Sequence, residues 1–285
     1  MALVATFGLA FGACTSTSPT PSSTPNADGV ASGGTLAAIK QRGVLKVGAE
    51  CLYKGTCFYD PATNSRQGYG VDLTDLLATD LGVTVEWVDL EWTALIPAVQ
   101  TGQIDVVTMG MTKTPARSLS VFMSDPMDYY PVGLVLHKDD PLNAETDINT
   151  VLAALNQPDK TITFLLGGAH EIIVDKNFPN ATKKGLDSAQ AFEEVASGRA
   201  SAMVVDTGDA WDYGQNNANA VVWQNRTISN HHGSFVIRYG DTEFLNYLNN
   251  WLEYYRANGT LRGMKSAWNA ERGIPDDLAG LPPAE

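Results

Sequence analysis

WTALIPAVQTGQIDVVTMGMTKTPAR, residues 92–117, is the stretch that decides the fold. Its first part predicts a short helix that ends at Gly102, because glycine commonly follows the last turn of a helix. The next run, 104–111, is almost wholly apolar and predicts a buried strand. A helix that leads directly into a buried strand is typical of an α/β protein with a parallel sheet.

The same alternation continues on both sides of this stretch. The sequence predicts strands over 44–48 and 83–88, with a helix over 71–82 between them that ends at Gly82. Towards the C-terminus it predicts strands over 161–166 and 202–206 and a helix from an N-cap at Ser188 to Gly198. VVWQN and FVIRY are separate strand candidates, and residues 242–259 have the apolar spacing of a long helix. Ligand sites of such sheets lie at the carboxyl ends of the strands.

The composition is that of a globular protein with an acidic surface. The 285 residues include 19 Lys and Arg against 32 Asp and Glu, which gives a formal net charge of −13. A surface of this sign repels phosphate backbones, so nucleic acid is not the expected partner. The acidity is otherwise explained by solubility.

The N-terminus differs from the rest of the chain. Residues 1–14 are apolar and predict a secretory signal peptide, and residues 15–35 are rich in Ser, Thr and Pro, as in a flexible tether. FGAC, residues 11–14, resembles a bacterial lipobox, which predicts that Cys14 is lipidated and anchors the protein on the extracytoplasmic face of the cell membrane. No later segment is apolar enough to cross a membrane.

Cys51 and Cys57 are the other two cysteines of the chain. A structural zinc site normally has four Cys or His ligands, and the histidines are remote in sequence from this pair. A redox pair is usually spaced as CxxC. In an oxidising compartment the pair therefore predicts a disulfide, and we expect no metal site and no cofactor.

Four polar or aromatic groups follow predicted strands. Arg117 can hold a carboxylate through two parallel hydrogen bonds, with Thr112 and the carbonyl of Gly110 nearby. The glycine turn at 167–168 opens a helix whose N–H groups favour an anion. Asp206 can pair with an ammonium group, and Tyr53 and Trp92 supply aromatic faces. Together these groups predict a site for a zwitterion.

The run from Gly43 to Trp268 resembles the family 3 extracellular solute-binding proteins, the amino-acid receptors of bacterial ABC importers. The resemblance is carried by GVLKVGAE, GYGVDLTDLLATDLG, residues 92–131, FLLGGAHE, ASGRASAMVVD and ANGTLRGMKSAW. It implies a type II periplasmic-binding-protein fold, in which each of two α/β lobes has a mostly parallel sheet flanked by helices and two crossing strands join the lobes. The expected boundaries are 36–130 and 229–275 for lobe one, 131–228 for lobe two, and 276–285 for a tail.

The resemblance also implies roles for single residues. Arg117 matches the arginine that binds the ligand carboxylate, and Asp206 the aspartate that pairs with the α-ammonium group. Ala169 lies where the family presents a backbone N–H to the carboxylate, and Glu50 matches an acidic position that faces the ligand side chain. The remaining matches are Thr112 and Gly110, which meet the amino acid backbone, and Tyr53 and Trp92, which sandwich the ligand.

The expected ligand is a polar L-amino acid, with glutamine or a basic amino acid favoured. Glu50 would repel a ligand carboxylate, since an unpaired like charge in a closed cleft is costly. Lys54, Lys113 and His170 could neutralise Glu50 and readmit an acidic ligand. We expect a monomer that delivers its ligand to an ABC permease and is not an enzyme.

The sequence leaves two alternative functions open. Some members of this fold are enzymes that resemble cyclohexadienyl dehydratase, for which Glu50, Glu171 or His170 would be the acid or base. A ligand-sensing partner of a membrane receptor is the other alternative.

Overall fold

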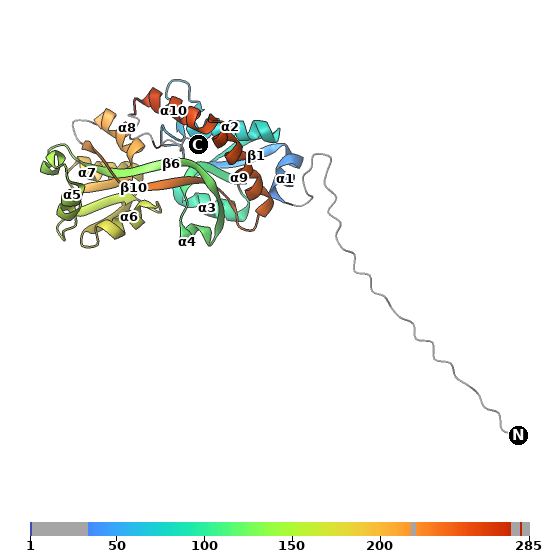
Figure 1. Cartoon of the computed structure of the whole chain (residues 1–285), viewed down its shortest axis with the longest axis horizontal. Coiled ribbons are helices and arrows are strands. Elements are labelled where there is room, and N and C mark those ends of the chain that lie inside the picture. Colours follow the sequence, from blue (N-terminus) through green and yellow to red (C-terminus); the bar gives the residue numbers. More distant parts are fainter. Residues whose placement is uncertain (2–33, 218–220, 275–279, 281–285) are drawn as a thin grey trace.

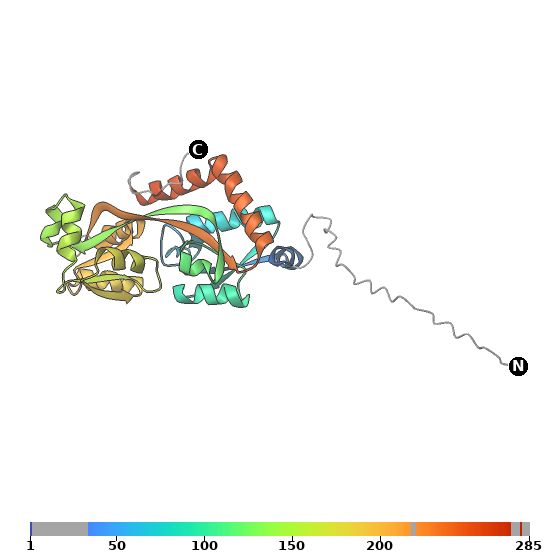
Figure 2. The same ribbon diagram turned by 60° about the horizontal axis from the view of Figure 1, so that its bottom comes forward.

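The computed structural model describes residues 34–217 and 221–274, together with Met1 and Gly280. Apart from Met1, the predicted signal peptide with Cys14 lies outside these residues, as do most of the tether and nearly all of the tail. The described chain forms two α/β lobes, and two long strands run from one lobe into the other (Figure 1). The view in Figure 2 shows the same two strands bridging the lobes.

Lobe one is built on three parallel strands. Strand β1 (Val44–Ala49) lies between β4 (Thr84–Asp89) and β5 (Val106–Thr112). The helices of this lobe are α1 (Thr35–Arg42), α2 (Tyr69–Leu81), α3 (Trp92–Thr101), α4 (Pro115–Ser118), α9 (Thr242–Ala257) and α10 (Thr260–Arg272). A small hairpin of β2 (Phe58–Tyr59) and β3 (Arg66–Gln67) follows the first strand.

Lobe two repeats the parallel arrangement. Strand β7 (Thr161–Leu165) lies between β8 (Thr182–Leu186) and β9 (Ala202–Asp206). Its helices are η1 (Pro141–Ala144), α5 (Ile148–Leu155), α6 (His170–Asn177), α7 (Ser188–Ala196) and α8 (Thr207–Asn217). Each lobe buries its own apolar residues, for example Leu45 and Leu73 in lobe one and Phe164 and Val204 in lobe two.

The crossing strands β6 (Val121–His137) and β10 (Val221–Arg238) are antiparallel and join the two parallel halves into one eight-stranded sheet. The order is β4-β1-β5-β10-β6-β9-β7-β8. VVWQN and FVIRY, predicted as separate strands, are two parts of β10, which is interrupted by register shifts. The expected lobe boundaries at 130/131 and 228/229 lie opposite each other, since Ser229 pairs with Val132 and Asn230 with Pro131.

Glycines end the helices of lobe one where the sequence predicts it. Gly82 and Gly102 adopt φ values of 66° and 76°, in the left-handed region that glycine enters without steric cost. The prediction of Ser188 as an N-cap is wrong by one residue. Asp187 is the N-cap of α7, and its carboxylate accepts a hydrogen bond of 2.9 Å from the Gln190 amide.

Within the described residues, no helix combines the length and the apolar character that a membrane span requires.

Candidate ligand-binding cleft

A cavity lies between the lobes, beside the crossing strands. It is lined by seven of the eight residues that the sequence predicts for the ligand site: Glu50, Tyr53, Trp92, Gly110, Thr112, Ala169 and Asp206. They come from the ends of β1, β5 and β9, from the loop after β1 and from the starts of α3 and α6. This is the carboxyl edge of both parallel sheets, where the α/β pattern places ligands.

The eighth residue, Arg117, does not line the cavity. Its guanidinium donates to the carbonyls of Thr112 at 2.7 Å and Gly167 at 2.8 Å, and lies 5.9 Å from the centre of the Trp92 ring. Burial lowers its pKa to about 10, which still leaves it charged at neutral pH. Because Gly167 belongs to lobe two, Arg117 connects the lobes at one side of the cavity.

Glu50 is held at the N-terminus of α3. Its Oε1 accepts a hydrogen bond of 2.9 Å from the Trp92 amide, so this carboxylate caps a helix that lacks a side-chain cap of its own. Its Oε2 is buried and has no hydrogen-bond partner among the described residues. Burial raises the pKa of Glu50, and the neighbouring carboxylates Glu91 and Asp187 raise it further.

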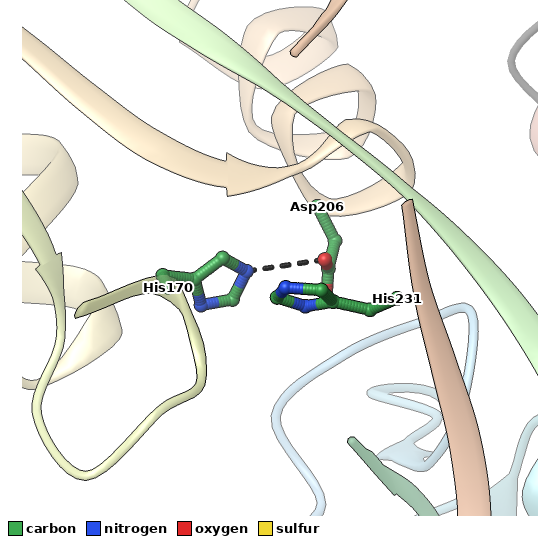
Figure 3. Close-up of side chains that lie close together, drawn as sticks. All are labelled: His170, Asp206 and His231. Atoms are coloured by element: carbon green, nitrogen blue, oxygen red, sulfur yellow. Dashed lines mark hydrogen bonds and ion pairs between the residues drawn. The ribbon is translucent and has the colours of Figure 1, made fainter. Parts of the chain in front are cut away.

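Asp206 is the last residue of β9 and meets two histidines. Its Oδ1 lies 3.1 Å from Nε2 of His170, and His231 approaches from β10 (Figure 3). Burial acts to raise the pKa of Asp206, but the hydrogen bond from His170 and the nearby basic groups His170, His231 and Lys265 together outweigh it, so that the pKa is lowered. Asp206 is therefore an ionised carboxylate that borders the cavity.

Gly110 and Thr112 lie beside the crossing strands. Gly110 has φ +69°, and a Cβ atom there would clash with the hydroxyl of Tyr130. Only glycine fits this position without moving Tyr130. The hydroxyl of Thr112 lies 3.4 Å from Nδ1 of His231.

Cys51 and Cys57 form the predicted disulfide, with their Cα atoms 4.5 Å apart. Between them, the amide of Tyr53 donates to the carbonyl of Cys57 at 2.9 Å, and the amide of Cys57 donates back at 2.9 Å. The closed loop thus fixes the backbone of Tyr53, whose ring forms one wall of the cavity.

A count of free thiols tests this disulfide. The full chain without lipid should show one titratable thiol, from Cys14, when it is unfolded without reductant, and three after reduction. Ellman's reagent in guanidinium measures both numbers. Three thiols before reduction, in protein purified without reductant, would contradict the disulfide.

A second connection between the lobes lies at the opposite end of the cavity. Arg272, the last residue of α10, donates to two groups of α8 in lobe two. They are the carboxylate of Asp212 and the carbonyl of Gly208. The Trp211 indole returns a hydrogen bond of 3.0 Å to the Arg272 carbonyl. Together with Arg117 and the Trp92 indole, which lies 3.4 Å from the Gly167 carbonyl, these contacts hold the lobes closed on both sides.

The family model for bacterial extracellular solute-binding proteins, family 3, matches residues 45–271. The chain belongs to this family. The expected family and the two-lobe fold are therefore confirmed, and the solute-binding role is the function that the family performs.

Individual relatives of this family 3 solute-binding protein are described as proteins that bind amino acids. The L-cystine-binding protein TcyA of Bacillus subtilis (strain 168) is 24% identical over 250 residues, which cover 86% of this chain and 88% of TcyA. The crystal structure of the ancestral amino acid-binding protein AncCDT-1, a precursor of cyclohexadienyl dehydratase, superposes with a TM-score of 0.72 at 36% identity, covering 83% of this chain and 99% of that one. An ancestral arginine-binding protein bound to arginine gives a TM-score of 0.70 at 32% identity, over 80% and 98% of the two chains.

Sequence reasoning missed several residues of this solute-binding protein's cleft. Lys265 and Arg272 line the cavity from α10, far along the chain from the predicted strand ends. The sequence suggests His170 only as a neutralising charge or a catalytic group, although it adjoins Ala169. His231 lies in a polar part of β10, and nothing in the sequence connects it to Asp206.

Proposed function

We propose that this family 3 solute-binding protein captures an L-α-amino acid with a cationic or amide side chain in the cleft between its lobes. Asp206 binds the α-ammonium group, with the Gly110 carbonyl and the Thr112 hydroxyl as further partners. The α-carboxylate lies between Arg117 and the amide of Ala169 at the start of α6, and takes over the hydrogen bond that Arg117 donates to Gly167. Tyr53 and Trp92 enclose the body of the ligand.

The preference for a cationic or amide side chain depends on one observation. Glu50 has one buried oxygen without a hydrogen-bond partner among the described residues, and two further carboxylates act on it. A buried acceptor of this kind costs free energy until a donor reaches it. An ammonium, guanidinium or amide group supplies that donor, whereas a ligand carboxylate adds a like charge.

The three residues named above as a possible acid or base have other placements or partners: Glu171 is exposed and does not line the cavity, Glu50 caps α3, and His170 is hydrogen-bonded to Asp206. These placements support binding without catalysis. The ancestral relative described as a precursor of a dehydratase is itself an amino acid-binding protein, which also supports this function.

Delivery and location complete the proposal. The protein is a monomer, anchored through lipidated Cys14 and the residue 15–35 tether on the extracytoplasmic face of the membrane, and passes its amino acid to an ABC permease. Globomycin treatment of cells that express the full chain tests the anchor, because it blocks signal cleavage at a lipidated cysteine.

A thermal-shift panel of the twenty amino acids tests the ligand class. Arginine, lysine or glutamine should raise Tm most, and aspartate and glutamate should have little effect. Glu50→Gln should reduce the shift for a cationic ligand more than that for glutamine, since a cation loses a charge partner worth about 1–3 kcal/mol. Asp159→Asn, which removes an exposed carboxylate of lobe two, is the matched control. A larger shift with glutamate than with arginine or glutamine would contradict the proposal.

A further inference from the structure

Three side chains from separate parts of the chain meet at the edge of the cleft. His170 is the first residue of α6, Asp206 is the last residue of β9, and His231 lies in the crossing strand β10. One ligand atom from each can be chosen so that all three lie within 4.8 Å of one another. Figure 3 shows both imidazoles directed towards the carboxylate.

The residue types of this cluster suit a metal ion. His231 is buried, as is His170, so bulk water competes little for their ring nitrogens. Asp206 supplies a carboxylate whose Oδ1 lies 3.1 Å from Nε2 of His170. Two imidazoles and one carboxylate are ligands that zinc and neighbouring divalent transition metals accept, with further positions left open.

The groups around the histidines allow the required tautomers. The Thr112 hydroxyl, 3.4 Å from Nδ1 of His231, can accept the proton of that nitrogen and leave Nε2 as the metal ligand. His170 is 7% exposed, and its Nδ1 has no hydrogen-bond partner among the described residues. Without metal, Nε2 of His170 donates its proton to the Asp206 carboxylate, and when Nε2 binds a metal the ring can carry its proton on Nδ1, which no other described group occupies.

We propose that His170, Asp206 and His231 form a binding site for a divalent transition-metal ion of the Zn²⁺ class. His170 and Asp206 both line the cavity, so the ion reaches the site from the cleft and keeps open coordination positions there. The ion joins lobe two, through His170 and Asp206, to the crossing strand that carries His231.

Metal and amino acid compete at this site. This consequence depends on the proposed function, in which Asp206 binds the α-ammonium group. A divalent ion bound to Asp206 repels an ammonium group at the same carboxylate, so zinc reports on the occupancy of the ammonium position.

Calorimetric titration of the full, untagged chain with ZnCl₂ tests the site. The protein is first treated with EDTA and dialysed, and no amino acid is present. We expect saturable binding of one ion per chain, and a loss of affinity of roughly 100-fold or more in His231→Ala and in His170→Asn, since each removes a ligand. Co²⁺ in place of Zn²⁺ should give visible absorption bands that both variants lose.

His232→Ala is the matched control. His232 is the next residue of β10, but it is exposed and its ring packs against Tyr129 at 4.8 Å, away from the cluster. Its removal should leave zinc affinity unchanged. Circular dichroism and Tm establish that each variant is folded. Absence of binding to the folded wild-type chain, or equal affinity in wild type and in folded His231→Ala and His170→Asn, would overturn the site.

A second titration separates this proposal from the proposed function. Added Zn²⁺ should weaken the binding of the amino acid that gives the largest thermal shift, and the loss should grow as the zinc occupancy rises. Zinc binding without any amino acid binding would refute the proposed function and leave the metal site standing. Amino acid binding with an unchanged Kd at saturating zinc would refute the competition.

Discussion

Asp206→Asn should lower the affinity for the amino acid by roughly 100-fold or more, because removal of one partner of a hydrogen-bonded charge pair costs about 2–5 kcal/mol. Asparagine keeps the size of the side chain and an acceptor oxygen, but not the charge that the α-ammonium group requires. The change also weakens the hydrogen bond with Nε2 of His170, because a neutral amide oxygen replaces a charged acceptor. Calorimetry with the amino acid selected by the thermal-shift panel measures the loss.

Asp175→Asn is the control for this substitution. Asp175 is an exposed carboxylate of α6 that pairs with Lys183 at the surface of lobe two. Its replacement removes the same charge from the same lobe and should leave the affinity within about twofold. An Asp206→Asn protein that binds as tightly as the wild type would show that the ammonium group is held elsewhere.

Lys265→Met should lower the free energy of unfolding by about 3–5 kcal/mol, since it leaves a buried carboxylate without its counter-ion. Asp128 in β6 is fully buried, and Lys265 in α10 is 4% exposed. The ammonium group lies 5.2 Å from the ring centre of Tyr69 and 5.0 Å from that of Tyr130, so aromatic rings surround the ion pair. Urea unfolding followed by circular dichroism gives the value.

Two further variants test whether the loss of stability comes from the unpaired buried charge. Lys265→Met combined with Asp128→Leu removes both charges and should recover much of the loss, because an apolar pair can replace a buried ion pair. Lys183→Met breaks only an exposed pair and should change stability by less than about 1 kcal/mol. A loss below about 1 kcal/mol in Lys265→Met would show that the Asp128 carboxylate is protonated or solvated.

The parts of the fold that the sequence predicts are those with local causes. Helices α2 and α3 end at Gly82 and Gly102 because the left-handed conformation selects glycine there, whatever the rest of the chain does. The N-cap of α7 was predicted one residue late, since Asp187 and Ser188 are both good caps and only the backbone geometry selects Asp187. The crossing strand β10 was not predicted as one element, because register shifts interrupt its pairing with β6.

The residues of the candidate site also fall into two groups, those that local sequence patterns predict and those that depend on contacts between distant segments. Glu50, Trp92 and Asp206 follow strands with clear apolar patterns, so their meeting at one edge follows from the topology. The encounter of His170 with His231 depends on how β10 passes lobe two, and the Lys265–Asp128 pair on how α10 packs against lobe one. Such contacts between distant segments leave no spacing in the sequence.

The hydrogen bonds that close the lobes on both sides of the cavity affect how long a ligand stays bound as well as how tightly it binds. A ligand enclosed between Arg117 at one side and Arg272 at the other can leave only after one set of these contacts has opened. Differences in affinity between related complexes arise mostly in the dissociation rate. The strength of these two contacts therefore sets the residence time of the amino acid, and with it the interval in which a permease must meet the loaded protein.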